Sequence, residues 1–169
     1  MIRLPDHPVT LELLTAAHAD AVLAFEQENR AYFASWIWDR GDEYFAEFAA
    51  RHAAMLAEQA TGACRFHVLT DDSGAVVGRV NLVDLEHGSA ELGYRIAEKW
   101  AGQGLATEAV RAIIGVAATE YGLTVLRAGA SDHNGASQAV LTRAGFRPVG
   151  TSSTSLGPGK KYELMLEGV

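Results

Sequence analysis

Residues 99–121, KWAGQGLATEAVRAIIGVAATEY, decide the fold, because they join a glycine-containing turn to a long amphipathic helix. Gly122 follows and suits a left-handed helix end. Apolar side chains recur at steps of three or four residues, which is typical of a helix with one buried face. These positions are Ala106, Val110, Ile113, Ala117 and Tyr121.

The turn Gly102-Gln103-Gly104 predicts a binding site for an anion. A turn that runs directly into a helix start presents unpaired backbone N–H groups and the positive end of the helix dipole. A phosphate is the natural ligand of such a site. The turn is not a P-loop, because no Gly-Lys-Ser/Thr follows, and Thr107 replaces the third glycine of a dinucleotide-binding fingerprint. The alternative is that the glycines only permit a tight turn.

The stretch before the turn predicts a strand over residues 90–96, with Leu92, Tyr94 and Ile96 on one face. For the whole chain we expect an α/β (α+β) fold with a mixed sheet of about seven strands. The other expected strands cover residues 9–14, 64–70, 75–85, 125–130, 146–151 and 162–166, and residues 152–161 are expected to form a loop. Expected helices cover residues 15–33, 42–59 and 136–143, besides the central one.

Length and composition limit the classes of protein that this chain can represent. Its 169 residues, 49% apolar and 21% charged, suit a single domain over 1–169 with an ordinary globular composition. No apolar run approaches the roughly 18 residues of a membrane span, and the N-terminus has no signal-peptide core. The one cysteine, Cys64, forms no internal disulfide, and we expect a cytoplasmic protein.

The net charge of −7 argues against a nucleic-acid partner, which would need a basic surface. An acidic surface mildly favours a cationic substrate such as an amine, through electrostatic steering. The six histidines show no metal-ligand spacing, so no metal is expected. Ser131, Asp132 and His133 are adjacent and therefore point in different directions, which excludes them as a hydrolase triad.

Glu91 has two interpretations. It lies on the strand face opposite Leu92, where a charged residue facing solvent is common. Alternatively, it is a general base, because Gly93 would leave room for substrate beside the carboxylate and partial burial would raise its pKa.

Asn134 and Ser137 also have two interpretations. Their three-residue spacing before a short helix suits an N-cap and a first-turn residue. The Ser137 hydroxyl would alternatively donate a hydrogen bond to a ligand that lies between two helix N-termini.

Several segments in this order resemble the GNAT acyltransferase superfamily, and its Rim-type branch of ribosomal-protein N-terminal acetyltransferases in particular. The family motif Gln/Arg-x-x-Gly-x-Gly/Ala is represented by residues 99–104, with Lys99 in the first position. The other similar segments are ENRAYF at 28–33, ELGY at 91–94, GQGLATEA at 102–109, NGAS at 134–137 and AGF at 144–146. The resemblance covers essentially the whole chain and implies a twisted, mostly antiparallel sheet with helices on both faces.

The resemblance implies an acetyl-CoA-dependent N-acetyltransferase that acts without a metal. Backbone amides from Gly102 to Ala106 would hold the pyrophosphate, and the pantetheine arm would lie beside the Ile96 end of its strand. The arm would enter a splayed opening between this strand and residues 125–130. The implied cosubstrate-binding residues are Ile96, Gly102, Gln103, Gly104, Leu105, Ala106, Thr107, Asn134 and Ser137.

The resemblance also assigns catalytic roles. Many family members use a tyrosine late in the short helix to protonate the leaving thiolate, but the matching position here is Leu141. Ser137 is the nearest replacement, and Glu91 is the candidate base. The acceptor would be a protein or peptide N-terminus or a small amine, with side chains between Asn29 and Trp38 on the acceptor side.

Two other functions remain open at this stage, together with a monomeric or homodimeric state. One is a catalytically silent sensor of the same fold that binds acyl-CoA. The other is a nucleotide-binding module that uses the glycine turn.

Overall fold

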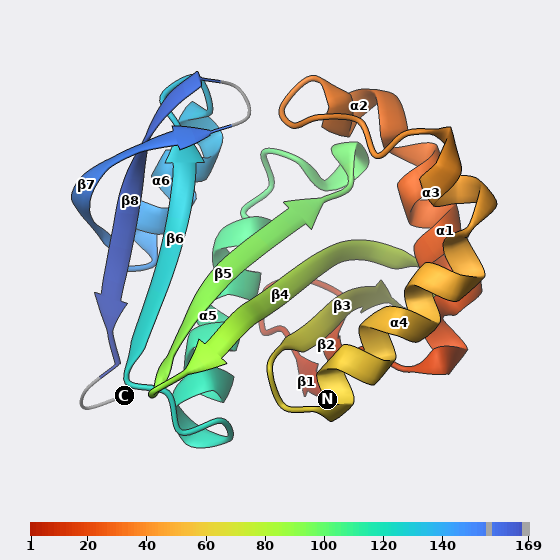
Figure 1. The fold of residues 1–169 in the computed structure, drawn as a ribbon, viewed down its shortest axis with the longest axis horizontal. Helices are drawn as coiled ribbons and strands as arrows, with labels where there is room; N and C mark the ends of the chain where they lie inside the picture. Colours follow the sequence, from red (N-terminus) through yellow and green to blue (C-terminus); the bar gives the residue numbers. More distant parts are fainter. Residues whose placement is uncertain (155–156, 167–169) are drawn as a thin grey trace.

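The computed structural model describes residues 1–154 and 157–166 and contains one eight-stranded sheet. The strand order is β1-β2-β3-β4-β5-β6-β8-β7, and the only parallel pair in these ranges is β5 with β6 (Figure 1). The strands are β1 (Ile2–Arg3), β2 (Val9–Leu13), β3 (Arg65–Asp71), β4 (Val76–Glu86), β5 (Ser89–Ile96), β6 (Val125–Ser131), β7 (Arg147–Thr154) and β8 (Gly157–Met165).

Helices cover both faces of the sheet and bury a separate apolar cluster on each. One cluster joins α5 to β4, β5 and β6, and the other joins α1 and α4 to β3. The helices are α1 (Ala19–Glu28), α2 (Arg30–Ala34), α3 (Asp42–Ala46), α4 (Phe48–Ala60), α5 (Leu105–Thr119) and α6 (Gly135–Arg143), with single 3₁₀ turns at Ala16–His18 and Glu98–Trp100. Within the described ranges, no helix has the length and apolar character that a membrane crossing requires.

The expected mixed, mostly antiparallel sheet is confirmed, with eight strands instead of about seven. The additional strand is β1, a two-residue strand that pairs with β2. Residues 152–161 are not the expected loop, because Ser152–Thr154 continue β7 and 157–161 begin β8. Residues 155 and 156 of the expected loop lie outside the described residues.

The two long N-terminal helices are each divided in two, which the apolar periodicity did not predict. The first division falls at Asn29, whose side-chain amide donates to the Phe25 carbonyl at 2.9 Å. The Asn29 Oδ1 accepts from the backbone N–H of Glu98, also at 2.9 Å, and so ties α1 to the segment after β5. The second division falls at Glu47, whose φ of −105° and ψ of 17° leave the helical range.

The parallel strands β5 and β6 diverge, and this divergence opens the sheet. They pair only at Ser89↔Val125, Ala90↔Leu126 and Glu91↔Arg127. Beyond that point β5 continues to Ile96 paired with β4 alone, and β6 continues to Ser131 paired with β8 (Figure 1). The predicted opening between the two strands is therefore present.

Candidate active site

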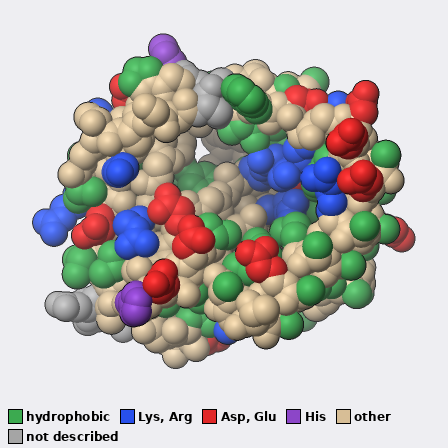
Figure 2. Space-filling model, viewed as in Figure 1, with side chains coloured by type: hydrophobic (Ala, Val, Ile, Leu, Met, Phe, Trp, Pro, Cys, Tyr) green, Lys and Arg blue, Asp and Glu red, His purple; other side chains and the backbone are tan. Residues whose placement is uncertain are grey.

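A cavity of about 470 Å³ lies where β5, the glycine turn, α2 and α6 converge. Its lining includes Tyr94, Arg95 and Ile96 from the end of β5 and Asn134, Ser137 and Arg143 from α6 and its N-cap. Figure 2 shows the molecule hollowed near the middle of the face that Figure 1 presents. The remaining lining residues are Tyr32, Phe33, Trp36, Ile37, Trp100, Ala101, Gly102, Gly104, Leu105, Ala106, Thr107, Ala136, Ala139 and Val140.

The backbone of the glycine turn leaves the start of α5 open to an anion. Gly102 and Gly104 have φ angles of +72° and +81°, in the left-handed region where a side chain is unfavourable. Gly104 is the N-cap of α5, and no side chain caps this helix. In the described part of the chain, no backbone N–H from Gly102 to Thr107 makes a hydrogen bond of normal geometry to a protein group. Five of these six residues, all except Gln103, line the cavity at the start of α5, where the helix dipole is positive.

His7 holds the glycine turn from the N-terminal side. Its Nε2 lies 2.8 Å from the Gln103 carbonyl oxygen, and its Nδ1 contacts the Glu108 carboxylate on the first turn of α5. The backbone N–H of Asp6 donates to the same carboxylate at 2.8 Å. The Gln103 side chain donates to the Lys99 carbonyl and does not line the cavity, so Gln103 serves the turn through its backbone.

Ser137 and Tyr94 meet in the cavity. The Tyr94 hydroxyl lies 2.9 Å from the Ser137 Oγ, which joins β5 to the first turn of α6. Burial is the main reason why the pKa of Tyr94 is raised, so the phenol is protonated at neutral pH. Leu141, the position of the family tyrosine, is fully buried in the core. The sequence interpretation missed Tyr94 as a site residue, although its place on the same face as Ile96 was predicted.

Asn134 is the N-cap of α6, as one of the two sequence interpretations expected. Its Oδ1 accepts a hydrogen bond from the backbone N–H of Ser137 at 3.1 Å. Asn134 and Ser137 both line the cavity, together with Ile96, Leu105, Ala106 and Thr107 of the predicted set.

Glu91 does not line the cavity and is not brought together with Ser137. It lies on β5 where the strands begin to diverge, and its Oε2 is 4.0 Å from the Arg127 Nε. Its side chain is 44% exposed. Its pKa is raised, mainly by partial burial, although Arg127 opposes the shift. A Cβ placed at Gly93 would meet nothing within 4 Å, so the predicted open space beside Glu91 is present.

Comparison with known proteins agrees with this geometry. Residues 9–147 match the family model of the acetyltransferase (GNAT) domain. The probable N-acetyltransferase YjcK of Bacillus subtilis (strain 168) is 28% identical over 143 residues, which cover 81% of this chain and 79% of that protein. The ribosomal protein uS5-alanine N-acetyltransferase of Escherichia coli (strain K12) is 27% identical over 155 residues, covering 88% and 80%.

The fold is also similar to a solved structure that contains coenzyme A. RimJ of Mycobacterium smegmatis in complex with CoA-disulfide superposes with a TM-score of 0.84 at 22% identity, covering 95% of this chain and 83% of that one. The family match, the open sheet and the unpaired amides at the head of α5 lead to one conclusion. The chain belongs to the GNAT family and is an N-acetyltransferase.

Proposed function

We propose that this protein transfers an acetyl group from acetyl-CoA directly to a primary amine. One observation carries the proposal: Gly102 and Gly104–Thr107, whose N–H groups are unpaired, line the same cavity as the Tyr94–Ser137 hydroxyl pair. If the diphosphate of acetyl-CoA binds those amides, the rest of acetyl-CoA would extend along the cavity towards the hydroxyl pair. Acetyl-CoA, when bound, supplies a thioester whose carbonyl carbon accepts the amine.

The edge of β5 next to the opening would position the pantetheine arm. Residues 92–96 are paired with β4 on one side and have no partner strand on the other, as far as the structure describes the chain. Free backbone groups along such an edge bind an extended chain in the manner of an added strand. Arg143 lines the cavity from α6 and adds a positive charge that complements phosphate groups.

The Tyr94–Ser137 pair would serve the departing sulfur. The thiolate that leaves needs a proton or a strong hydrogen bond, and Tyr94 remains protonated because burial raises its pKa. Its hydroxyl hydrogen-bonds Ser137, so Tyr94 would pass a proton to Ser137 as Ser137 donates one to the sulfur, and Tyr94 would regain its proton from water that enters the cavity after CoA leaves. Donors fixed in advance at the point where negative charge develops stabilise the transition state.

Glu91 is our candidate for the base that removes a proton from the attacking ammonium group. Its pKa is raised, mainly by partial burial, which makes the carboxylate a stronger base than an exposed glutamate. Because Glu91 lies outside the cavity lining, it would act through a water molecule in the open space over Gly93.

The test is release of CoA thiol when the protein is mixed with acetyl-CoA and a panel of primary amines. Turnover by wild type, reduced about 10²–10⁴-fold in Glu91→Gln or Ser137→Ala, supports the proposal and these roles. Binding of acetyl-CoA with no thiol release for any amine identifies a silent acyl-CoA sensor. Competition of CoA binding by ATP or NAD identifies a nucleotide-binding module.

A further inference from the structure

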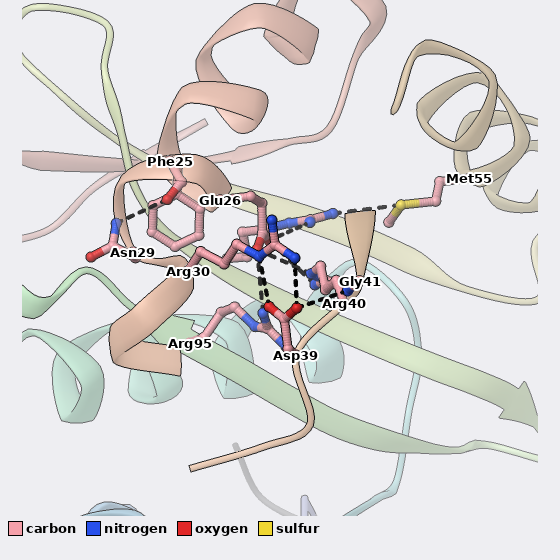
Figure 3. A network of polar contacts seen from close by, with 10 residues as sticks. Phe25, Glu26, Asn29, Arg30, Asp39, Arg40, Gly41, Met55 and Arg95 are labelled. Atoms are coloured by element: carbon pink, nitrogen blue, oxygen red, sulfur yellow. Dashed lines mark hydrogen bonds and ion pairs between the residues drawn. The ribbon is translucent and has the colours of Figure 1, made fainter. Parts of the chain in front are cut away.

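A fully buried carboxylate lies beside the end of the cavity that Phe33 and Ile37 line, and it is surrounded by three arginines. Glu26 is 1% exposed. Its two oxygens accept hydrogen bonds from Arg40 Nε at 3.0 Å, Arg79 Nη1 at 3.0 Å and Arg95 Nη1 at 3.3 Å (Figure 3). We call Glu26, Arg40, Arg79 and Arg95 the arginine cluster. Its members come from α1, the segment before α3, β4 and β5, so the fold converges on this point.

The arginine cluster carries an excess of positive charge inside an acidic protein. Three guanidinium groups share one carboxylate, which leaves two positive charges uncompensated. Two further carboxylates, those of Asp39 and Asp42, pair with Arg30 at 2.7 and 2.9 Å and not with the cluster. When Arg30, Asp39 and Asp42 are counted with the cluster, one positive charge still remains. The Asp42 side chain is 95% exposed, so solvent strongly screens its charge. Figure 2 shows the gathered Lys and Arg side chains beside the central hollow.

Arg95 brings this charge to the cavity. Its guanidinium donates one hydrogen bond, to Glu26, and lies over the Phe33 ring at 4.8 Å from the centroid. Its other N–H donors have no protein partner in the part of the chain that the structure describes. The side chain is 21% exposed and lines the cavity. Burial, followed by repulsion from Arg40, outweighs the attraction of Glu26 and lowers the pKa of Arg95 to about 10.

The wall beside Arg95 is apolar and aromatic. Phe33, Trp36 and Ile37 line the same cavity. Phe33, Ile37 and Arg95 also line a small adjoining recess of about 10 Å³ that reaches Glu26 and Arg40. The cavity therefore ends in an apolar surface with one underused guanidinium fork, which is the geometry that binds a carboxylate bidentately.

We propose that the acceptor of this enzyme is an amine that carries a carboxylate a few atoms from its amino group and an apolar body, and that Arg95 binds the carboxylate. The inference rests on the proposed acetyl transfer and specifies its substrate class. Such a group is found as the α-carboxylate of an apolar amino acid and as an acidic side chain next to the N-terminus of a peptide. A polyamine, which brings only positive charge, would be repelled from the arginine cluster.

The first experiment uses the wild-type protein and matched acceptors that differ only in charge. L-phenylalanine is compared with L-phenylalaninamide, and Ala-Asp-Phe-amide with Ala-Asn-Phe-amide, with spermidine as the cationic control. The amine of the amino acid amide has the lower pKa and is the more available nucleophile, so a preference for the carboxylate does not come from amine reactivity. We expect kcat/KM to be about 10-fold or more higher for the carboxylate member of at least one pair. The pair that shows the preference identifies the source of the carboxylate.

The second experiment removes the charge of Arg95. Arg95→Gln should raise KM for the preferred carboxylate about 10–100-fold and leave KM for acetyl-CoA and for the uncharged analogue within about 2-fold. Arg3→Gln is the matched control, because Arg3 pairs with Asp72 at the surface and lies outside the cavity, and it should change none of these constants. Loss of activity with every acceptor alike would indicate a structural role for Arg95.

The outcomes separate this inference from the proposed function. If wild type acetylates amides or spermidine as well as it acetylates the carboxylates, the inference is wrong and the acetyl transfer stands. If no amine in the panel releases thiol, the proposed function itself fails. If Arg95→Gln does not fold, the comparison of matched acceptors on wild type still decides the inference.

Discussion

The Tyr94 hydroxyl lies 2.9 Å from the Ser137 Oγ and connects β5 to α6 across the cavity. The two residues are 43 positions apart in the chain. Among the residues that the structure describes, each hydroxyl has the other as its side-chain hydrogen-bond partner. We propose that this contact replaces the tyrosine that many family members place on the short helix, since Leu141 holds that position and is buried.

Tyr94→Phe should reduce kcat about 10–10²-fold. The variant keeps the aromatic ring but removes the hydroxyl from which, in the proposed function, Ser137 regains its proton. KM for acetyl-CoA should change little. Steady-state kinetics measure both constants. Tyr121→Phe is the matched control, because Tyr121 also hydrogen-bonds through its hydroxyl, to His67 at 2.8 Å, but lies outside the cavity lining. Equal losses in the two variants would show that Tyr94 has only a structural role.

Gly104→Ala should weaken CoA binding, because Gly104 adopts a φ of +81° that costs an L-residue about 1–2 kcal/mol. The strained turn would shift the amides that face the diphosphate. Gly115→Ala lies within α5, where an added methyl group meets nothing within 4 Å. It should raise the free energy of unfolding by about 0.5–1 kcal/mol and leave CoA binding intact. Calorimetric titration with CoA and urea unfolding test both variants, and equal affinity in Gly104→Ala would count against the turn as the diphosphate site.

The contact of His7 with Glu108 should make the glycine turn sensitive to pH. The pKa of His7 is raised, chiefly by its hydrogen bond to Glu108. Because the folded pKa lies above the unfolded value of about 6.5, the stabilisation is full below that pH and is lost as pH rises through the folded pKa. Protonated His7 donates from both ring nitrogens, to Glu108 and to the Gln103 carbonyl. In His7→Gln, the free energy of unfolding should no longer show this dependence on pH. Identical plots of unfolding free energy against pH for wild type and His7→Gln would exclude a stabilising contact.

Glu26→Gln should lower the free energy of unfolding by about 3–5 kcal/mol, because it leaves Arg40, Arg79 and Arg95 without their buried counter-charge. Burial alone would raise the pKa of Glu26, but the three arginines outweigh it and the pKa is lowered. The stability that this carboxylate contributes is therefore present above the unfolded pKa of about 4.3 and is lost as pH falls through the lower folded value. Urea unfolding measures the change.

Asp42→Asn is the control for Glu26→Gln. Asp42 also binds an arginine, but it is 95% exposed, so its loss should change the free energy of unfolding by less than about 0.5 kcal/mol. A comparable loss in both variants would mean that burial of Glu26 does not matter.

The central part of the fold was predictable from local patterns. The spacing of Ala106, Val110 and Ile113 predicted α5, and all three pack on the core side. The alternation in residues 90–96 predicted Leu92, Tyr94 and Ile96 on one face, and all three belong to the apolar cluster that α5 joins. Such patterns succeed because they record which side of a helix or strand is buried.

Features that depend on distant contacts were not predictable. The glycines and proline of Gly157–Lys161 predict a loop, but these residues form the first half of β8. A Cβ at Gly159 would lie 2.5 Å from the Ala130 carbonyl oxygen. The glycine permits close approach of β6, which local sequence does not reveal. The division of the first helix at Asn29 likewise depends on Glu98, 69 residues away.

The residues of the site also fall into those that the sequence predicted and those that only the fold reveals. Ser137, Asn134 and the glycine turn belong to short motifs, and the structure brings them to one cavity. Arg95 and Glu26 are 69 residues apart and belong to no motif, so only the fold reveals the arginine cluster. The net charge of −7 suggested a cationic substrate, but the cavity wall at Arg95 is positive. The sum over a whole chain does not describe one wall of a site.

In the proposed function, the backbone amides of Gly102–Thr107 bind the diphosphate of CoA. Titration of ¹⁵N-labelled protein with CoA, followed by two-dimensional amide NMR, tests this binding most directly. We predict that these six amide resonances shift strongly and saturate together, with smaller changes in the residues of α4. Saturable CoA binding that shifts amides elsewhere and leaves residues 102–107 unchanged would contradict the account.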